Sequence, residues 1–247
     1  MDAQTNALLV DWDQPFGLPP YDQIRVPHFK PALEQAMQQH RAQVAAITAN
    51  PAAADFDNTV AALDRAGDRL GRIEAVFHGL GASFTSADLQ AVQREMAGPV
   101  AAHWSAVHQD AALFARLDAV HQQRERLGLS PEQQRLVQRL HRDFVRSGAQ
   151  LDSAARARFA EIQQQLAQLT TRFGQNVLHD EAAFSLALPD AAAQAGLPDF
   201  VLAAARQAAA DRQLGDVPVI TLSRSLILPF LSFSTRRDLR ELAWRAW

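Results

Sequence analysis

The sequence predicts an all-α protein with a minor two-strand β element. Apolar residues recur at three- and four-residue steps along most of the chain, which is the spacing of one helical face. Proline, serine, aspartate and glycine stand where such helices would begin and end. Two short stretches, 184–188 and 217–222, instead alternate with a period of two, as strands do. We therefore expect a multi-helix lobe of antiparallel helices that carries two short strands.

The composition is that of an ordinary globular protein. Of 247 residues, 48% are hydrophobic and 21% charged, and a net charge of −3 gives no electrostatic case for a nucleic-acid or membrane partner. The absence of cysteine excludes disulfides, thiolate zinc sites and cysteine nucleophiles. No signal-peptide pattern opens the chain, and the longest apolar run, around 226–231, is far too short to cross a membrane. We expect a soluble, cytoplasmic protein.

Three segments follow one another along the chain. Residues 1–26 contain three prolines and predict an extended N-terminal arm. A helical lobe is expected over 27–182 and a mixed segment over 183–247. The first helix of the lobe follows Pro27, stops at Asn50, and has an apolar face made of Phe29, Leu33, Met37, His40, Val44 and Ile47.

Capping residues predict the next helices of the lobe. The second helix runs from the caps at 57–59 to Phe84, and the third begins at Ser86. Gly98-Pro99 is expected to kink or split the third helix, because proline removes a backbone hydrogen bond. Gly128 closes the fourth helix as a C-cap.

Two further helices complete the lobe. Ser130 and Gln133 form a predicted capping box for the fifth helix, which ends near Gly148. The sixth helix is the longest, from about Ser153 to Asp180, and its other face is rich in glutamine and arginine. Its apolar face consists of Phe159, Ile162, Leu166, Leu169, Phe173 and Val177.

The mixed segment is expected to hold the two strands and two helices. An alanine-rich helix lies between the strands, from Pro198 to about Arg212, and Ser234 caps a last helix that contains Trp244 and Trp247. Chain termini are usually polar, so two tryptophans in the last four residues suggest a chain that is cut rather than finished. The alternative is a docked C-terminal helix whose tryptophans complete the core.

The histidines show no linear pattern of a metal site. A zincin needs two histidines four residues apart with a glutamate between them, and no pair here has that spacing. His103 and His108 are five apart, and Asp118-Ala-Val-His121 is a single relative of the repeated Glu-x-x-His unit of di-iron bundles. We therefore expect no metal ligand and no bound cofactor in this chain.

The remaining polar motifs are weak. His141-Arg142-Asp143 shares only its letters with the kinase catalytic loop, and Gly79-Leu-Gly81 lacks the strand and third glycine of a phosphate loop. No Gly-x-Ser-x-Gly elbow is present. His179-Asp180-Glu181, after Asn176, could be an acid/base or substrate contact, but a histidine facing the helix C-terminus is the favoured reading. We predict no catalytic residue, and substrate-binding residues stay unknown.

Several segments resemble a known family. They include LPPYDQIRVPHFKPALEQAM at 18–37, FDNTVAALDRAGDRLGRIEAVFHGL at 56–80 and FGQNVLHDEAAFSLAL at 173–188, together with 113–151, 195–200 and 219–247. In order along the chain, these resemble the bacterial oligopeptidase A and peptidyl-dipeptidase family of zinc metallopeptidases, relatives of thimet oligopeptidase. The sequences of segments 56–80 and 113–151 are most similar to the peptidyl-dipeptidase branch.

The resemblance implies an N-terminal lobe without the active site. Members of this family are mostly helical, with two lobes beside a deep channel, and their zinc is held by His-Glu-x-x-His and a downstream glutamate in the C-terminal half. The full-length protein would hydrolyse short peptides with zinc, while this chain would form one wall of the channel, contact the missing C-terminal lobe and be inactive alone. We expect the isolated chain to self-associate. The alternative is a free-standing helical module that binds peptides or proteins without catalysis.

Overall fold

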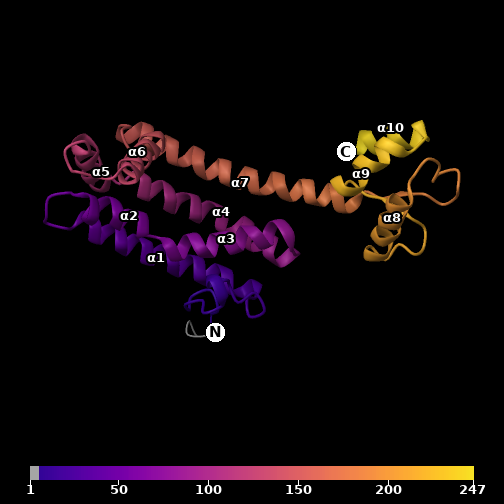
Figure 1. Ribbon diagram of the computed structural model, residues 1–247, viewed down its shortest axis with the longest axis horizontal. Helices are drawn as coiled ribbons and strands as arrows, with labels where there is room; N and C mark the ends of the chain where they lie inside the picture. The colour runs from indigo at the N-terminus through magenta and orange to yellow at the C-terminus, as the bar shows by residue number, and fades with distance from the viewer. Residues whose placement is uncertain (1–5) are drawn as a thin grey trace. The chain divides into compact units, whose positions relative to one another are not determined.

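The computed structural model describes residues 6–247, which divide between Thr171 and Arg172 into two compact units (Figure 1). The described chain is mainly helical and has a single two-stranded sheet, which confirms the predicted fold class. Among the described residues, no helix combines the length and the apolar character that a membrane crossing requires.

The first unit is built around helix α1, Phe29–Thr48, which follows two short 3₁₀ turns at Pro15–Gly17 and Val26–His28. Helices α3, Asp68–Ser83, and α4, Ala87–His108, pack against α1. Helices α5, Ala111–Gln123, and α6, Pro131–Arg146, form an antiparallel hairpin (Figure 1). Helix α7, Ser153–Ala183, begins in this unit and continues into the second.

One face of α1 supplies two separate hydrophobic cores. Its six predicted apolar-face positions are all buried, as the three- and four-residue spacing predicts. Phe29, Leu33 and Met37 belong to a first core, shared with α3 and α4. Val44 and Ile47 belong to a second core, shared with α5 and α6. Burying one stripe of α1 therefore assembles most of the unit.

The segment before α1 contributes to the first core. Ala7, Leu8, Leu9 and Ile24 are buried there. The indole N–H of Trp12 donates to the Ala7 carbonyl, and the Arg72 guanidinium lies 4.1 Å above the Trp12 ring. Residues 1–5 of the predicted arm lie outside the described residues. The described part of this segment therefore packs against the helices that follow it.

The prediction of a single helix over 57–84 is wrong, because three helical elements occupy this stretch. A π-helical stretch, Phe56–Ala61, leads into the short α2, Ala62–Arg65, before α3 begins. Asp55 is the cap, and its carboxylate accepts from the Asn58 amide at 2.7 Å. The break comes at Gly67, whose φ of 77° is left-handed. A Cβ on Gly67 would lie 2.9 Å from the His40 ring.

The predicted caps of α4 and α6 are confirmed. Ser86 accepts from the Leu89 amide, and Ser130 and Gln133 make both hydrogen bonds of a capping box. Of the expected kink or split at Gly98-Pro99, the split is wrong, because helix α4 continues through Pro99 as one helix. Helix α5 ends at Gln123, earlier than predicted, and Gly128 lies in the following turn with a φ of 65°.

Two imidazoles pair at the centre of the unit, between α1 and α4. His40 Nδ1 lies 2.9 Å from His103 Nε2, and both residues are buried. Arg41 lies 3.4 Å from the other nitrogen of His103 and can only donate, which leaves His103 Nε2 as the donor to His40. Burial lowers the pKa of His103 to about 4, with His40 and Arg41 adding to the effect. Burial also lowers the pKa of His40. The pair is therefore neutral near pH 7.

The second unit holds the predicted strands. β1, Leu186–Ala187, pairs antiparallel with β2, Val219–Ile220, so that Leu186 lies opposite Ile220. The alanine-rich helix α8, Asp199–Asp211, lies between them in sequence, close to its predicted range. The unit's core combines side chains from these elements and the last two helices, among them Leu188, Val201, Ala205, Ile220, Ile227, Phe230 and Ala243.

The end of the chain differs from the sequence prediction in two places. The apolar run around 226–231 forms an unpredicted helix, α9, Arg224–Phe233. Ser234 ends α9, and the N-cap of α10, Arg237–Ala246, is Arg236, so the predicted Ser234 cap is wrong. The Ser234 hydroxyl instead accepts from the Arg236 amide in the turn between the two helices. Trp244 and Trp247 are more than half exposed in this chain.

We expect Gly67→Ala to lower the free energy of unfolding by about 1–2 kcal/mol, because the left-handed backbone conformation at this position is unfavourable for alanine. The methyl group would also push on the His40 ring. The matched control is Gly71→Ala in the interior of α3, where a Cβ meets open space. Urea denaturation should show that the free energy of unfolding of Gly71→Ala is higher than that of the parent by about 0.5–1 kcal/mol. Equal effects of the two substitutions would contradict this account.

The His40–His103 pair predicts a loss of stability in mild acid. Between pH 6.5 and about 4, the unfolded state takes up a proton on His103 that the folded state excludes, so stability falls as the pH falls. Through His103 alone, lowering the pH from 7 to 5 should reduce the free energy of unfolding by about 2 kcal/mol. Urea denaturation of His103→Gln should show a correspondingly flatter pH profile, whereas His179→Gln on exposed α7 should match the parent. Parallel profiles for parent and His103→Gln would refute the prediction.

Candidate functional site

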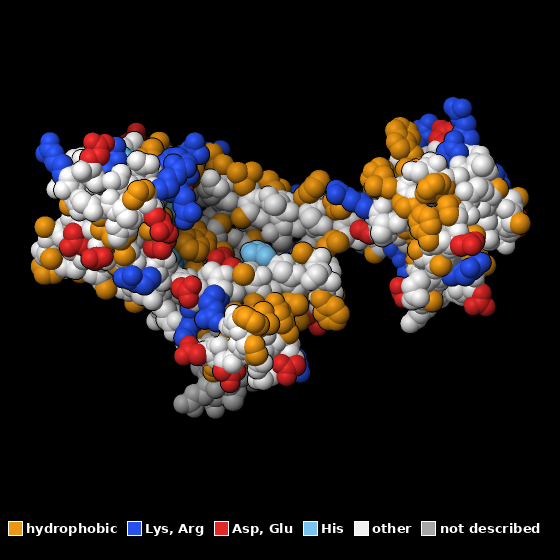
Figure 2. All heavy atoms as spheres, viewed as in Figure 1, with side chains coloured by type: hydrophobic (Ala, Val, Ile, Leu, Met, Phe, Trp, Pro, Cys, Tyr) orange, Lys and Arg blue, Asp and Glu red, His pale blue; other side chains and the backbone are white. Residues whose placement is uncertain are grey.

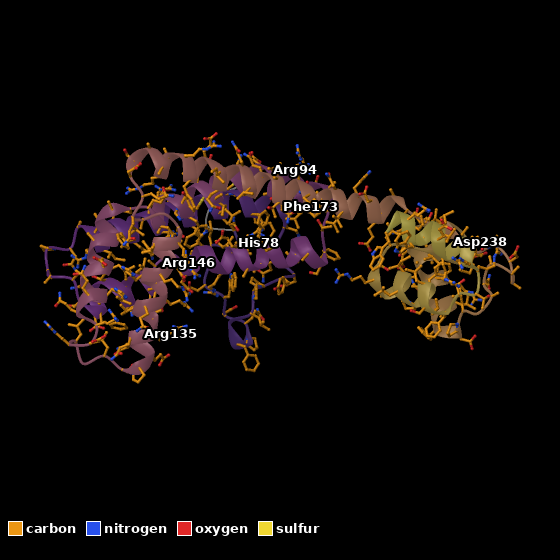
Figure 3. The ribbon with its side chains drawn as sticks, turned by 90° about the horizontal axis from the view of Figure 1, so that it is seen from above. His78, Arg94, Arg135, Arg146, Phe173 and Asp238 are labelled. Atoms are coloured by element: carbon orange, nitrogen blue, oxygen red, sulfur yellow. The ribbon has the colours of Figure 1, made fainter. Side chains whose placement is uncertain are left out.

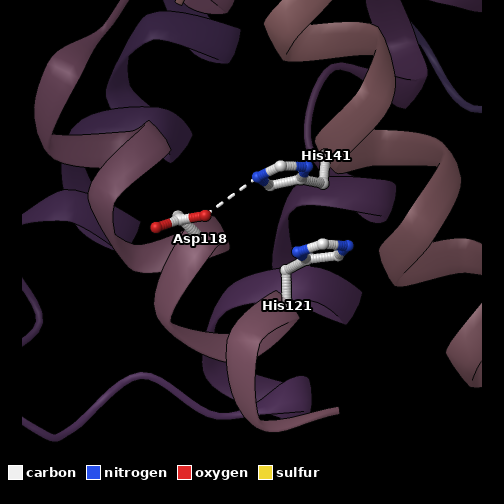
Figure 4. Close-up of side chains that lie close together, drawn as sticks. All are labelled: Asp118, His121 and His141. Atoms are coloured by element: carbon white, nitrogen blue, oxygen red, sulfur yellow. Dashed lines mark hydrogen bonds and ion pairs between the residues drawn. The ribbon is translucent and has the colours of Figure 1, made fainter. Parts of the chain in front are cut away.

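Three side chains of metal-ligand type converge between α5 and α6. Asp118 and His121 are three residues apart on α5 and so share one face of that helix. His141 approaches them from α6 (Figure 4). The ligand atoms of all three lie within 4.8 Å of one another.

Direct contacts hold the three side chains in place. His141 Nε2 lies 2.9 Å from Asp118 Oδ1, and Gln122 Nε2 donates to Asp118 Oδ2. The His121 and His141 rings stack with centroids 3.9 Å apart and an interplanar angle of 6°. The Phe114 ring lies 5.4 Å from that of His141 and bounds the cluster on its apolar side. The Asp118 and His141 side chains are 31% and 16% exposed, so solvent reaches the cluster.

The hairpin fold positions these residues. Leu113, Leu117 and Val120 of α5 are buried in the second core, together with Val137 and Phe144 of α6. A helix that buries those positions leaves Asp118 and His121 at the edge of the buried stripe, and His141 holds the matching place on the partner helix. The cluster therefore borders an apolar seam, where polar groups have fewer water contacts than on an open helix face.

The electrostatic setting favours a neutral His121. Burial lowers its pKa most, followed by the neighbouring His141 and the positive charge of Arg124, while Asp118 acts in the opposite direction. Arg124 donates to the His121 backbone carbonyl, which holds its guanidinium near the cluster. A neutral imidazole keeps a nitrogen lone pair available, and two imidazoles with one carboxylate form a donor set suited to divalent transition metals.

The structure separates the residue pairs that the sequence singled out. His103 pairs with His40, whereas His108 Nδ1 contacts the Trp104 backbone carbonyl at 2.8 Å. In the His141-Arg142-Asp143 run, Arg142 and Asp143 pair with each other, while His141 turns toward Asp118. Along the sequence, Asp118-Ala-Val-His121 has no second unit of the same kind. The short link between α5 and α6 was the available signal that His141 could join it.

The other weak motifs lie on helices. His179, Asp180 and Glu181 are part of the last turn and a half of α7, where His179 and Asp180 are exposed. Gly79 and Gly81 lie inside α3, and a Cβ on Gly81 would clash with the Gln93 amide of α4. Gly81 therefore leaves room for the Gln93 side chain of α4.

The sequence of the chain is similar to those of several bacterial peptidases. No family model matches it. Dipeptidyl carboxypeptidase of Escherichia coli K12 is 36% identical over 236 residues, and that of Salmonella typhimurium 36% over 237; each match covers 96% of this chain and 35% of the relative. Oligopeptidase A of Salmonella typhimurium is 30% identical over 244 residues, covering 98% of this chain and 35% of the relative.

The chain thus spans about a third of the length of the curated relatives that it matches. The match runs over nearly the whole chain, as the resemblance of its segments predicts, and it is stronger to the dipeptidyl carboxypeptidases than to the oligopeptidase A proteins. By sequence, this chain is therefore a relative of the dipeptidyl carboxypeptidases and oligopeptidases A and corresponds to the N-terminal region of such a peptidase.

Proposed function

We propose that this chain is the non-catalytic N-terminal lobe of a zinc-dependent peptidyl-dipeptidase or oligopeptidase and forms one wall of its substrate channel. The observation that carries the proposal is the 36% identity to dipeptidyl carboxypeptidases over 96% of this chain but 35% of their length. A channel that admits short flexible peptides and excludes folded proteins needs a second wall. A helical lobe with two packed cores can supply it.

The catalytic zinc is assigned to other residues of the complete protein. The zinc site that the resemblance implies needs His-Glu-x-x-His, and this sequence contains no such motif. The Asp118 cluster has a different donor set, with no glutamate between its histidines to act as a base. The residues of this chain therefore contribute shape, water exclusion and contacts to the peptide rather than bond cleavage.

An exposed apolar face on α7 supports a role as part of a larger assembly. Ile162, Leu166 and Leu169 are 38–51% exposed, and no residue of α7 is buried. Hydrophobic side chains are visible along this helix in Figure 2, and Phe173 on the same helix is labelled in Figure 3. Contiguous exposed apolar surface on a helix marks an interaction site. In the proposed protein, the C-terminal lobe would cover it.

We expect the reading frame that encodes this chain to continue beyond Trp247 into a His-Glu-x-x-His segment. The complete product should release dipeptides from the C-terminus of an N-blocked peptide, and EDTA should abolish the activity because the metal supplies the attacking water. Cleavage of a peptide blocked at both ends would instead assign the oligopeptidase type.

The 247-residue chain is the matched control in the same assay and should release no dipeptide. A stop codon directly after the Trp247 codon would contradict the proposal. That result would favour the free-standing peptide- or protein-binding module.

The α7 face should also drive self-association of the isolated chain. Sedimentation velocity should show oligomers that increase with concentration and that Leu166→Ser/Leu169→Ser reduces, because serine removes apolar contact area. Both leucines are exposed, so the free energy of unfolding should change by about 0.5 kcal/mol or less. Leu127→Ser, at another exposed leucine, in the turn after α5, is the control and should leave association unchanged. A monomer at every concentration would refute this prediction.

A further inference from the structure

We infer that Asp118, His121 and His141 form a binding site for one Zn²⁺ ion that joins α5 to α6. This inference is independent of the proposed peptidase function, since all three residues lie in the first unit and none belongs to a peptidase motif. It departs from the expectation of no metal ligand, which considered spacing along one helix only. Here the third ligand comes from a neighbouring helix.

The donor atoms suit zinc in kind and number. Two imidazole nitrogens and one carboxylate oxygen are common protein ligands of Zn²⁺, and a water molecule completes a four-coordinate site. The side chains are partly exposed, so solvent can supply that water. Two histidines favour zinc over magnesium or calcium, which prefer ligand sets made of oxygen atoms.

The distances require side-chain adjustment but no movement of the helices. In a tetrahedral zinc site with bonds of ~2.1 Å, ligand atoms lie about 3.4 Å apart. Here Asp118 Oδ1 and His141 Nε2 lie 2.9 Å apart, and all ligand atoms lie within 4.8 Å. The two rings are parallel, so each must turn about its Cβ–Cγ bond before both lone pairs meet at one ion. That torsion is soft for histidine, whereas the second core fixes the two backbones.

His121 is the residue that a simple ion pair leaves unexplained. The Asp118–His141 contact could by itself serve as a structural link between the helices. Within the part of the chain that the structure describes, no side chain or backbone group hydrogen-bonds a ring nitrogen of His121, although its ring lies directly against His141. A cation shared by both rings and Asp118 gives that nitrogen a partner.

The charged side chains around the cluster have opposite effects on a bound cation. Asp118 offsets one positive charge of the ion, while Arg124, held at the His121 carbonyl, repels it. Arg124 also lies 3.4 Å from Glu125, which partly neutralises it. Binding would displace the proton on His141 Nε2 and replace one hydrogen bond with three metal bonds.

Isothermal titration of the metal-free 247-residue chain with ZnCl₂ at pH 7.5 tests the inference. We expect one Zn²⁺ per chain, with an affinity that falls about tenfold or more in His121→Ala and in Asp118→Asn. Asp118→Asn keeps a hydrogen-bond acceptor for His141, so the fold is preserved while the charge is lost. His179→Ala, at an exposed histidine of α7, is the matched control and should bind zinc as the parent does.

A measurement on the unsubstituted chain keeps the test valid if a variant fails to fold. In long-range ¹H–¹⁵N spectra, zinc should shift the imidazole signals of His121 and His141, and those of buried His40 and His103 should stay in place. The inference is overturned if no zinc binds at ~100 µM. It is equally overturned if stoichiometric binding survives both substitutions, or if the shifted signals belong to other histidines.

Discussion

The first unit depends on the burial of a single stripe along α1. Phe29, Leu33 and Met37 anchor one core, and Val44 and Ile47 anchor the other, so both collapse onto the same helix. His40 occupies the middle of that stripe, where a polar ring can be buried only with a partner. His103 provides the hydrogen bond, and the missing side chain of Gly67 leaves room for the ring. The glycine at the break before α3 and the histidine on α4 that faces α1 therefore both accommodate the buried His40 ring.

The second core positions the side chains of the Asp118, His121 and His141 cluster. By fixing α5 against α6 through buried aliphatic and aromatic side chains, it holds two histidines and an aspartate together at the edge of the seam. Each of these residues is unremarkable on its own helix. Their proximity is a property of the hairpin, and it gives the first unit a polar cluster of two imidazoles and one carboxylate.

The division between buried and exposed apolar surface connects the fold to the proposed role. Helix α1 buries its whole apolar stripe inside the unit, whereas α7 leaves its own stripe partly exposed. Because exposed leucines and phenylalanines lower the solubility of a free chain, such a stripe is expected where further polypeptide packs. Two buried cores and an exposed apolar stripe are what the proposed role, one wall of a channel in a larger protein, requires.

By itself, the sequence determined the helical class, the stripe of α1, the caps at Ser86 and Ser130, the two strands and the peptidase kinship. These depend on local periodicity, local hydrogen bonds or direct similarity. Only the tertiary structure decided the break at Gly67, the burial of His40 against His103, helix α9 and the convergence of His141 on Asp118 and His121. Each of these requires contacts between residues distant in sequence or burial that outweighs local propensity, and a one-dimensional pattern contains neither.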